Sequence, residues 1–275
     1  MPVNSGLSSR LKIAIPVIAG LLVLIFYFPS STKFVIGLVL LRSLWEFFIV
    51  FRLTAPAFRA FTWPALIYSG LFMMYASEVD GPTPTPLVFL GLLGVFALQL
   101  FFPRSKQGMA RIAITLTGFI YIVWLGSHSF YLYNLGSAAH GSLLLFSIFF
   151  ICKFSDSTAY FAGRAYGKKK LIPRVSPNKT VEGLLGAYVG GLCGIPFLLG
   201  LGSFNFGHAF LFCILLVTVA SLGDLFESQF KRELGVKDTA DDIPGFGGAL
   251  DMIDSVLWCV PAAYWYVVSM ELIPA

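Results

Sequence analysis

Long apolar segments dominate this chain and leave it few ways to fold. They recur along nearly its whole length, and each is long enough to cross a bilayer as a helix of about 20 residues. A mean hydropathy of +0.82 with only 12% charged residues excludes an ordinary soluble domain. We therefore predict an all-α polytopic membrane protein with about nine transmembrane helices. The expected spans are 13–29, 34–51, 60–77, 86–103, 111–134, 142–163, 183–201, 208–226 and 249–272.

The distribution of Lys and Arg predicts the orientation of these spans. Of the 19 basic residues, sixteen fall in segments on one side, Lys33 alone falls on the other, and Arg42 and Lys153 lie within spans. Because cytoplasmic loops are enriched in basic residues, we predict a cytoplasmic N-terminus and an outside C-terminus. The net charge of +5 is then explained by contacts with anionic lipid headgroups, and no nucleic-acid partner is expected.

The two halves of the chain differ in polar content, which suggests a division into residues 1–140 and 141–275. In the first half, Arg42 and Glu46 are four residues apart and share one helix face. They either line a polar cavity or form a pair that fixes helix packing. The second interpretation is favoured, because charges within membranes usually pair. In the second half, glycines and other small residues recur every four positions over 155–167 and again over 183–194, which predicts close helix packing.

Two polar stretches of the second half are candidate substrate contacts. Asp156 lies three residues after Lys153, so it either binds substrate or neutralises that lysine. The stretch 176–180 then precedes a glycine-rich helix that Thr180 is placed to cap. Since helix N-termini attract anions, the side chains of this stretch are expected to hold a phosphate group. They are Ser176, Asn178, Lys179 and Thr180.

A third stretch, from Gly223 to Ser255, concentrates acids and bases at a membrane boundary. Asp224, Ser228 and Lys231 share one helix face, with Arg232 and Lys237 following. Asp251 and Asp254 lie three residues apart at the start of the last helix, where Gly247 and Gly248 allow close backbone approach. Carboxylate oxygens suit Mg²⁺ better than Zn²⁺. We therefore expect the three aspartates to hold one or two metal ions, and the alternative is that they are solvated carboxylates at the helix ends.

This third stretch resembles the signature of the phosphatidate cytidylyltransferases, or CDP-diacylglycerol synthases. The similar positions are 228–232 (SQFKR), 237–238, 244–245, 247–248, Asp251 and 254–255, and the segments 156–157 and 176–183 are also similar. Two positions differ from the family's usual pattern. Phe246 stands where the family generally has His, and Met252 stands where Arg usually follows the first aspartate. These differences leave the lipid acceptor open.

The resemblance implies an enzyme of the bacterial inner membrane, typically a homodimer, that joins CTP to phosphatidic acid with magnesium. Asp224, Asp251 and Asp254 would then hold the metal, and Lys231 and Arg232 would act beside them in catalysis. Substrate contacts are expected from Asp156, Ser176, Asn178, Lys179, Thr180, Ser228, Lys237, Gly247 and Gly248. One alternative is a CTP-dependent kinase, or a cytidylyltransferase for another lipid such as an isoprenoid. A more distant alternative is a transporter that uses the charges within the membrane.

Overall fold

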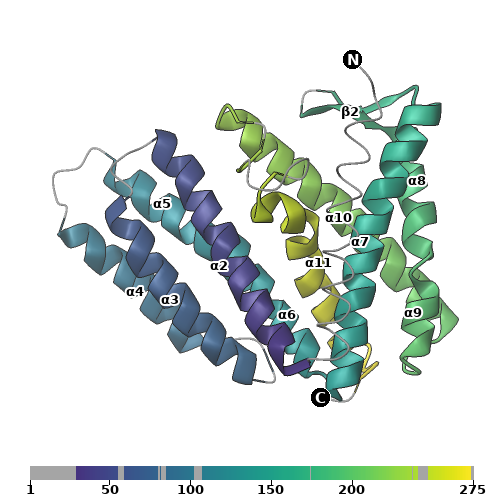
Figure 1. The fold of residues 1–275 in the computed structure, drawn as a ribbon, viewed down its shortest axis with the longest axis horizontal. Helices are drawn as coiled ribbons and strands as arrows, with labels where there is room; N and C mark the ends of the chain where they lie inside the picture. Colours follow the sequence, from purple (N-terminus) through teal and green to yellow (C-terminus); the bar gives the residue numbers. More distant parts are fainter. Residues whose placement is uncertain are drawn as a thin grey trace. The chain divides into compact units, whose positions relative to one another are not determined.

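The structure is a computed structural model that describes residues 29–54, 59–79, 81, 85–101, 107–173, 175–236, 238–240 and 247–273. Residues 13–28 of the first expected span lie outside this part of the chain, as do Lys237 and Phe246. Helices account for most of the described residues (Figure 1). The elements in chain order are α2 (Pro29–Thr54), α3 (Arg59–Glu78), α4 (Thr85–Leu100), α5 (Gly108–Gly118), the π-helix η2 (Phe119–Trp124), α6 (Leu125–Asn134), α7 (Ala138–Tyr166), β1 (Lys170–Ile172), β2 (Ser176–Thr180), α8 (Val181–Leu192), α9 (Ile195–Gly200), α10 (Phe206–Glu233) and α11 (Ala249–Ser269).

Membrane-spanning helices are the main feature of this fold. Within the described residues, six helical segments are long and apolar enough to cross a bilayer. They are Ser31–Phe51, Gly108–Asn134, Ala138–Tyr166, Val181–Gly200, Phe206–Glu233 and Ala249–Ser269. The expected spans 60–77 and 86–103 also correspond to helices, namely α3 and α4. The apolar part of α4, Pro86–Leu100, is shorter than the six spanning segments. The chain is therefore an all-α polytopic integral membrane protein, as predicted.

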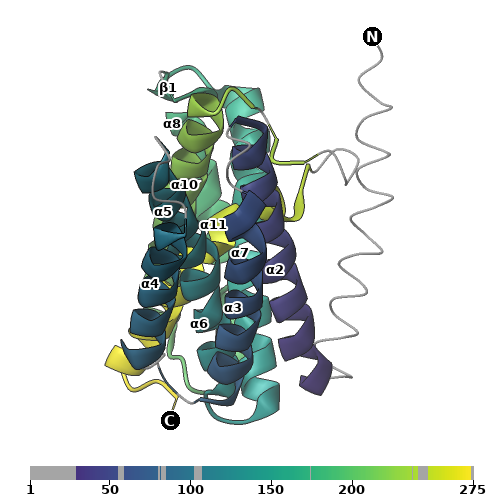
Figure 2. The ribbon, with the colours of Figure 1, turned by 90° about the vertical axis from the view of Figure 1, so that its left-hand side faces the viewer.

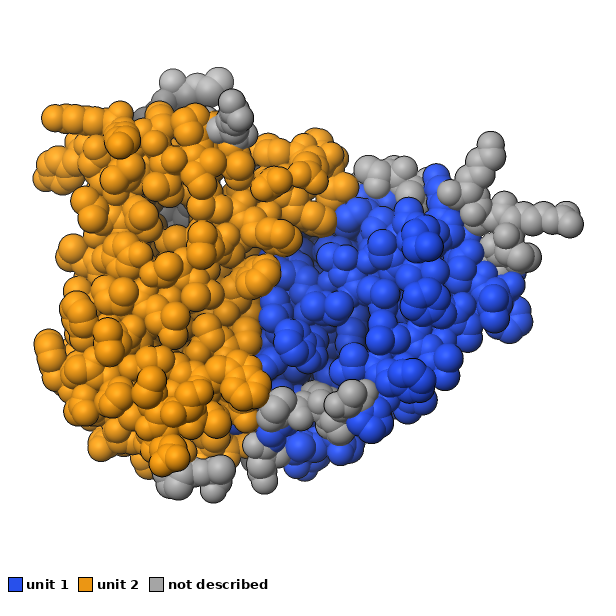
Figure 3. Space-filling view, turned by 180° about the vertical axis from the view of Figure 1, so that it is seen from behind, with its two compact units in different colours: residues 1–20, 30–131, 238–252 blue, residues 21–29, 132–237, 253–275 orange. Residues whose placement is uncertain are grey.

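The chain divides into two compact units, coloured separately in Figure 3. Unit 1 contains the described residues of Ser30–Tyr131 and Asp238–Met252, and unit 2 contains those of Leu132–Lys237 and Ile253–Ala275. Helix α11 therefore begins in unit 1 and continues into unit 2. These units are defined by contacts, whereas the division expected at residue 140 was drawn from polar content.

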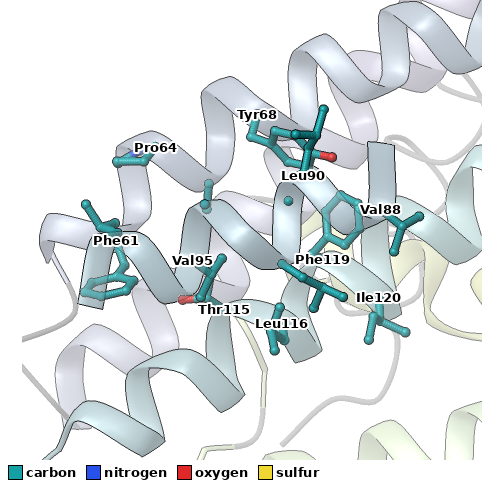
Figure 4. A pocket seen from close by; sticks show the side chains of 15 residues that line it. Phe61, Pro64, Tyr68, Val88, Leu90, Val95, Thr115, Leu116, Phe119 and Ile120 are labelled. Atoms are coloured by element: carbon teal, nitrogen blue, oxygen red, sulfur yellow. The ribbon is translucent and has the colours of Figure 1, made fainter. Parts of the chain in front are cut away.

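In unit 1, helices α3, α4 and α5 lie side by side around an apolar pocket (Figures 2 and 4). The pocket has a volume of about 230 Å³. Tyr68 of α3 and Phe119 of η2 point toward it, with their ring centroids 5.6 Å apart. The Tyr68 hydroxyl donates a hydrogen bond to the backbone carbonyl of Leu87. The Tyr68 ring lies against Gly91, where any larger residue would collide with it.

In unit 2, helices α7 and α8 pack closely along their length, and the antiparallel β1–β2 hairpin connects them (Figure 1). A Cβ atom at Gly190 would lie 2.0 Å from the Thr158 hydroxyl oxygen, and one at Gly186 would lie 2.4 Å from the Ala162 Cβ. The small residues therefore let the two backbones approach each other, as the spacing predicted. This packing gives the hairpin and the start of α8 a fixed position beside α7.

Candidate functional site

A pocket of about 540 Å³ in unit 2 contains many of the predicted substrate-binding residues. Its walls come from α7, the hairpin, α8 and α10. Its polar lining residues are Asp156, Tyr160, Arg164, Asn178, Lys179, Thr180, Ser221 and Asp224. The structure thus brings together side chains from three separate polar segments of the sequence. Tyr160, Arg164 and Ser221 were not predicted, although Arg164 is two helical turns after Asp156 on the same helix.

The start of α8 forms one wall of this pocket. The Thr180 hydroxyl accepts a hydrogen bond from the Gly183 amide at 3.1 Å, which confirms the predicted N-cap. The Glu182 carboxylate accepts hydrogen bonds from the backbone amides of Lys168 and Lys169, at 3.0 and 3.2 Å, and so ties the segment just before β1 to α8. The Val181 amide likewise donates to the Lys169 carbonyl at 2.9 Å, so the positive charge that this helix end offers a ligand is that of the helix dipole.

Lys179 and Asp224 form an ion pair across the pocket. The Lys179 ammonium, at the end of β2, lies 2.6 Å from the Asp224 carboxylate on α10. Both side chains are about one-quarter to one-third exposed, at 26% and 34%. Asp224 also accepts a hydrogen bond from Ser228 at 3.4 Å. The pair is therefore accessible to a ligand, and an incoming phosphate would exchange the carboxylate for its own oxygens at Lys179.

Lys153 links α7 to α11 through a second charge cluster. Its ammonium lies 3.6 Å from the Asp156 carboxylate and 3.5 Å from that of Asp254, and it donates a hydrogen bond to the Ser255 hydroxyl at 3.1 Å. The pairing of Lys153 with Asp156, one of the two alternatives left open by the sequence, is present, and Asp156 also lines the pocket. The wider cluster was not predicted, because Asp254 and Ser255 are about 100 residues further along the chain.

Glu227 is a buried acid to which the sequence analysis assigned no role. Its side chain is fully buried, and its carboxylate lies 3.3 Å from the Lys231 ammonium. Glu227 lies three residues after Asp224 and four residues before Lys231, on the same helix face. This spacing was the signal that could have identified it.

Asp251 belongs to a hydrogen-bond network within unit 1. Its Oδ2 atom accepts hydrogen bonds from the Thr239 amide, the Thr239 hydroxyl and the Gly248 amide, at 2.9, 2.9 and 2.8 Å. Gly247 has a φ of +83°, and a Cβ atom there would lie 2.4 Å from the same Oδ2. The close approach to the backbone predicted for this glycine is therefore present. The group that approaches Gly247 is the Asp251 carboxylate of the same chain.

Glu46 joins this network from helix α2. Its carboxylate accepts hydrogen bonds from the Ala249 and Leu250 amides, each at 2.9 Å, and from the Thr239 hydroxyl at 3.4 Å. Arg42 lies 3.3 Å from it, which confirms the predicted ion pair. The interpretation of this pair as a device for helix packing was incomplete, because Glu46 also binds the start of α11.

The remaining predicted residues occupy other positions. Ser176 lies at the start of β2 opposite Ile172. Lys231 and the exposed Arg232 lie in the last turn of α10. Within the described part of the chain, none of these residues or Ser228 lines the unit 2 pocket. Lys237 lies outside the described residues.

The donor chemistry of unit 2 suits magnesium. Among the described residues, no three His, Cys, Asp or Glu side chains are grouped to hold a metal ion by themselves. Magnesium, however, is commonly held by one or two carboxylates together with substrate phosphates, and it retains some of its waters. Asp224 at the pocket and Asp254 beside Lys153 offer such oxygens. The role of Asp251 as a metal ligand stays a prediction.

Comparison with known proteins identifies the family. The chain is 31% identical to the phosphatidate cytidylyltransferase of Haemophilus influenzae over 94% of this chain and 98% of that protein. It is 31% identical to the Thermotoga maritima enzyme of the same name, over 70% and 72% of the two chains. The Staphylococcus epidermidis enzyme of this name is 39% identical over 51% and 54%. Residues 8–270 match the cytidylyltransferase family as a whole, and the chain therefore belongs to that family.

Proposed function

We propose that this chain transfers the cytidylyl group of CTP to phosphatidic acid, giving CDP-diacylglycerol and pyrophosphate. Its membership of the cytidylyltransferase family supports this reaction, as do relatives that carry the name phosphatidate cytidylyltransferase. The observation that carries the proposal is the unit 2 pocket, where Lys179, Asp224 and the N-terminus of α8 meet. Such a pocket matches a triphosphate, which needs positive charge along one side and a metal-binding carboxylate on the other.

The proposed reaction is an in-line displacement at phosphorus. A phosphate oxygen of the lipid attacks the α-phosphorus of CTP. The bond between the α-phosphorus and the oxygen that bridges it to the β-phosphate breaks, and pyrophosphate leaves with that oxygen. A phosphate monoester is already anionic near neutral pH, so the reaction needs no dedicated general base. Positioning and charge neutralisation then supply most of the catalysis.

Residues of the pocket would perform that positioning. Lys179 leaves Asp224 to bind phosphate oxygens, while the positive end of the α8 dipole favours negative charge beside it. Lys153 compensates the charges of Asp156 and Asp254 and so lets these carboxylates remain close together. The Glu227 carboxylate compensates the charge of the Lys231 ammonium and so fixes the position of that side chain. The side chains are thereby arranged before the substrates arrive.

Magnesium fits this arrangement as the resident metal, which Asp224 of the pocket would hold together with the triphosphate, with Asp254 as a predicted further ligand. When bound, it would neutralise charge on the CTP phosphates and polarise the α-phosphorus. We keep Asp251 as a predicted further ligand, and one or two ions are compatible with the available oxygens.

The proposed setting is a bacterial inner membrane, with about nine crossings, a cytoplasmic N-terminus and the pocket facing the cytoplasm. The asymmetry of Lys and Arg supports this orientation, because Lys168, Lys169 and Lys170 of the hairpin segment next to the pocket are among the sixteen bases expected inside. CTP would then arrive from the cytoplasm while the acyl chains of the lipid stay in the bilayer. We also expect a homodimer.

The experiment that tests the function uses purified protein in detergent with magnesium and a panel of lipid phosphates. CTP carries a radioactive label at either its α- or its γ-phosphate, and the lipid product is identified by mass. The proposal predicts α-label in CDP-diacylglycerol and none from the γ-label. Transfer of the γ-label alone would show a lipid kinase, and α-label in another lipid would show a different acceptor.

A further inference from the structure

We propose that Glu46 is a positioning residue of this enzyme, which holds the start of α11 and with it the Asp251 carboxylate. The inference rests on the proposed function and extends the active site to helix α2 in the N-terminal half. The sequence resemblance covered only the C-terminal half and gave Glu46 no role. Every contact in the argument lies within unit 1.

The backbone amides at the start of α11 need hydrogen-bond acceptors from outside the helix. The first turn of an α-helix has backbone N–H groups without intrahelical acceptors, and the N-cap side chain normally accepts from them. The residue before α11 is Gly248, which has no side chain. Glu46 supplies the missing acceptor from a separate helix, with Oε1 on the Ala249 amide and Oε2 on the Leu250 amide, both at 2.9 Å.

The Glu46 carboxylate fits closely against Gly248. A Cβ atom at Gly248 would lie only 2.2 Å from the Glu46 Oε2. The Glu46 side chain is 1% exposed, whereas its partner Arg42 is 43% exposed. A buried carboxylate is costly unless it is paired and hydrogen-bonded, and here two amides, a hydroxyl and a guanidinium satisfy it. The site is therefore built around an ionised carboxylate at this position.

The Thr239 hydroxyl and the backbone at the start of α11 connect Glu46 to Asp251. The Thr239 hydroxyl shares its single proton between the two carboxylates, with its oxygen 2.9 Å from Asp251 Oδ2 and 3.4 Å from Glu46 Oε2. The Gly248 amide donates to Asp251 at 2.8 Å, while the next two amides donate to Glu46. The two acids thus share one short segment of backbone and one hydroxyl. A shift of Glu46 displaces the segment that orients Asp251.

The test compares Glu46→Gln and Glu46→Ala with the wild type in detergent. Glutamine has the same shape, but its NH₂ group would face a backbone amide that also donates. Misplacement of a catalytic group by about 1 Å is enough to lower the rate about 100-fold. We therefore expect kcat to fall about 100-fold in Glu46→Gln, with little change in the KM for CTP. Ser43→Ala is the matched control, because Ser43 is a buried polar residue of α2 that bonds its own helix at the Val39 carbonyl.

Hydrogen–deuterium exchange of the same proteins gives a readout that does not depend on activity. The amides of Ala249 and Leu250 should exchange faster in both Glu46 variants and at the wild-type rate in Ser43→Ala. Wild-type kcat in a folded Glu46→Gln protein would overturn the inference, as would unchanged exchange. A loss of yield with normal kcat in the folded fraction would show a structural role alone and would also overturn it.

The two proposals fail in distinguishable ways. If the wild type made no product from CTP and any lipid phosphate, the proposed function would be wrong. The exchange comparison would still show whether Glu46 holds the start of α11.

Discussion

Replacement of Gly248 by alanine tests the geometry at the start of α11 most simply. The new Cβ atom would lie 2.2 Å from the Glu46 Oε2 and 2.7 Å from the Thr239 hydroxyl, whereas real Cβ contacts are essentially never below 3.0 Å. The carboxylate must therefore retreat by about 0.8 Å, the difference between the 2.2 Å and 3.0 Å separations, from an amide that it now contacts at 2.9 Å. Loss of one hydrogen bond to a charged group costs about 2 kcal/mol.

The expected result is lower thermal stability together with lower activity. For a chain of this size, 2 kcal/mol corresponds to a fall in the melting temperature of about 4–8 °C, measured by thermal unfolding in detergent. Gly37→Ala is the matched control, since a Cβ atom at Gly37 of α2 meets nothing within 4 Å. That substitution should be neutral or stabilising by up to about 1 kcal/mol, because alanine is the better helix former.

A double-mutant cycle with Glu46→Ala identifies the cause of the effect. Truncation of Glu46 removes the closest atom that the new Cβ would strike and leaves only the 2.7 Å approach to the Thr239 hydroxyl, so Gly248→Ala should cost less in that background than in the wild type. If the two substitutions were additive, or if Gly248→Ala were as stable and active as Gly37→Ala, the close fit of Glu46 against Gly248 would be refuted. A rise in the KM for CTP alone would instead support Gly248 as the direct substrate contact that the sequence suggested.

Three further predictions concern the substrates and the metal. Lys179→Ala should raise the KM for CTP about 10- to 100-fold, because a charge-assisted contact is lost, while Lys169→Ala, which leaves the backbone amide in place, should not; equal KM values for both would contradict the role of Lys179. Asp251→Asn should abolish turnover in steady-state assays while expression and folding remain normal, and near-normal activity would remove Asp251 from the catalytic set. Chelation by EDTA should stop the reaction and added Mg²⁺, but not Zn²⁺, should restore it, whereas turnover that persists in excess EDTA would argue against the metal.

Local spacing and chemistry made several structural features predictable. The apolar segments located helices α2 to α11 because lipid imposes their length and composition. Thr180 was recognisable as an N-cap, since it precedes a helical glycine pattern. Residues four apart or fewer, such as Arg42 with Glu46 and Lys153 with Asp156, could be paired from helix geometry alone.

Contacts between distant segments could not be derived in this way. Glu46 and Leu250 are 204 residues apart, and Lys153 and Ser255 are 102 apart, so no local pattern links them. The burial of Glu227 was also hidden, because its helix is apolar on several faces and the acid resembled a solvated residue. Each of these contacts depends on how the helices pack, which one sequence does not specify.

The position of the nucleotide is the most direct test of the account. The measurement is an experimental structure with magnesium and a CTP analogue in which a methylene group replaces the oxygen between the α- and β-phosphates. We predict that the triphosphate lies in the unit 2 pocket, with the Lys179 ammonium on a phosphate oxygen instead of the Asp224 carboxylate that it now contacts at 2.6 Å. A triphosphate bound elsewhere, with the Lys179–Asp224 pair intact, would contradict the proposed site.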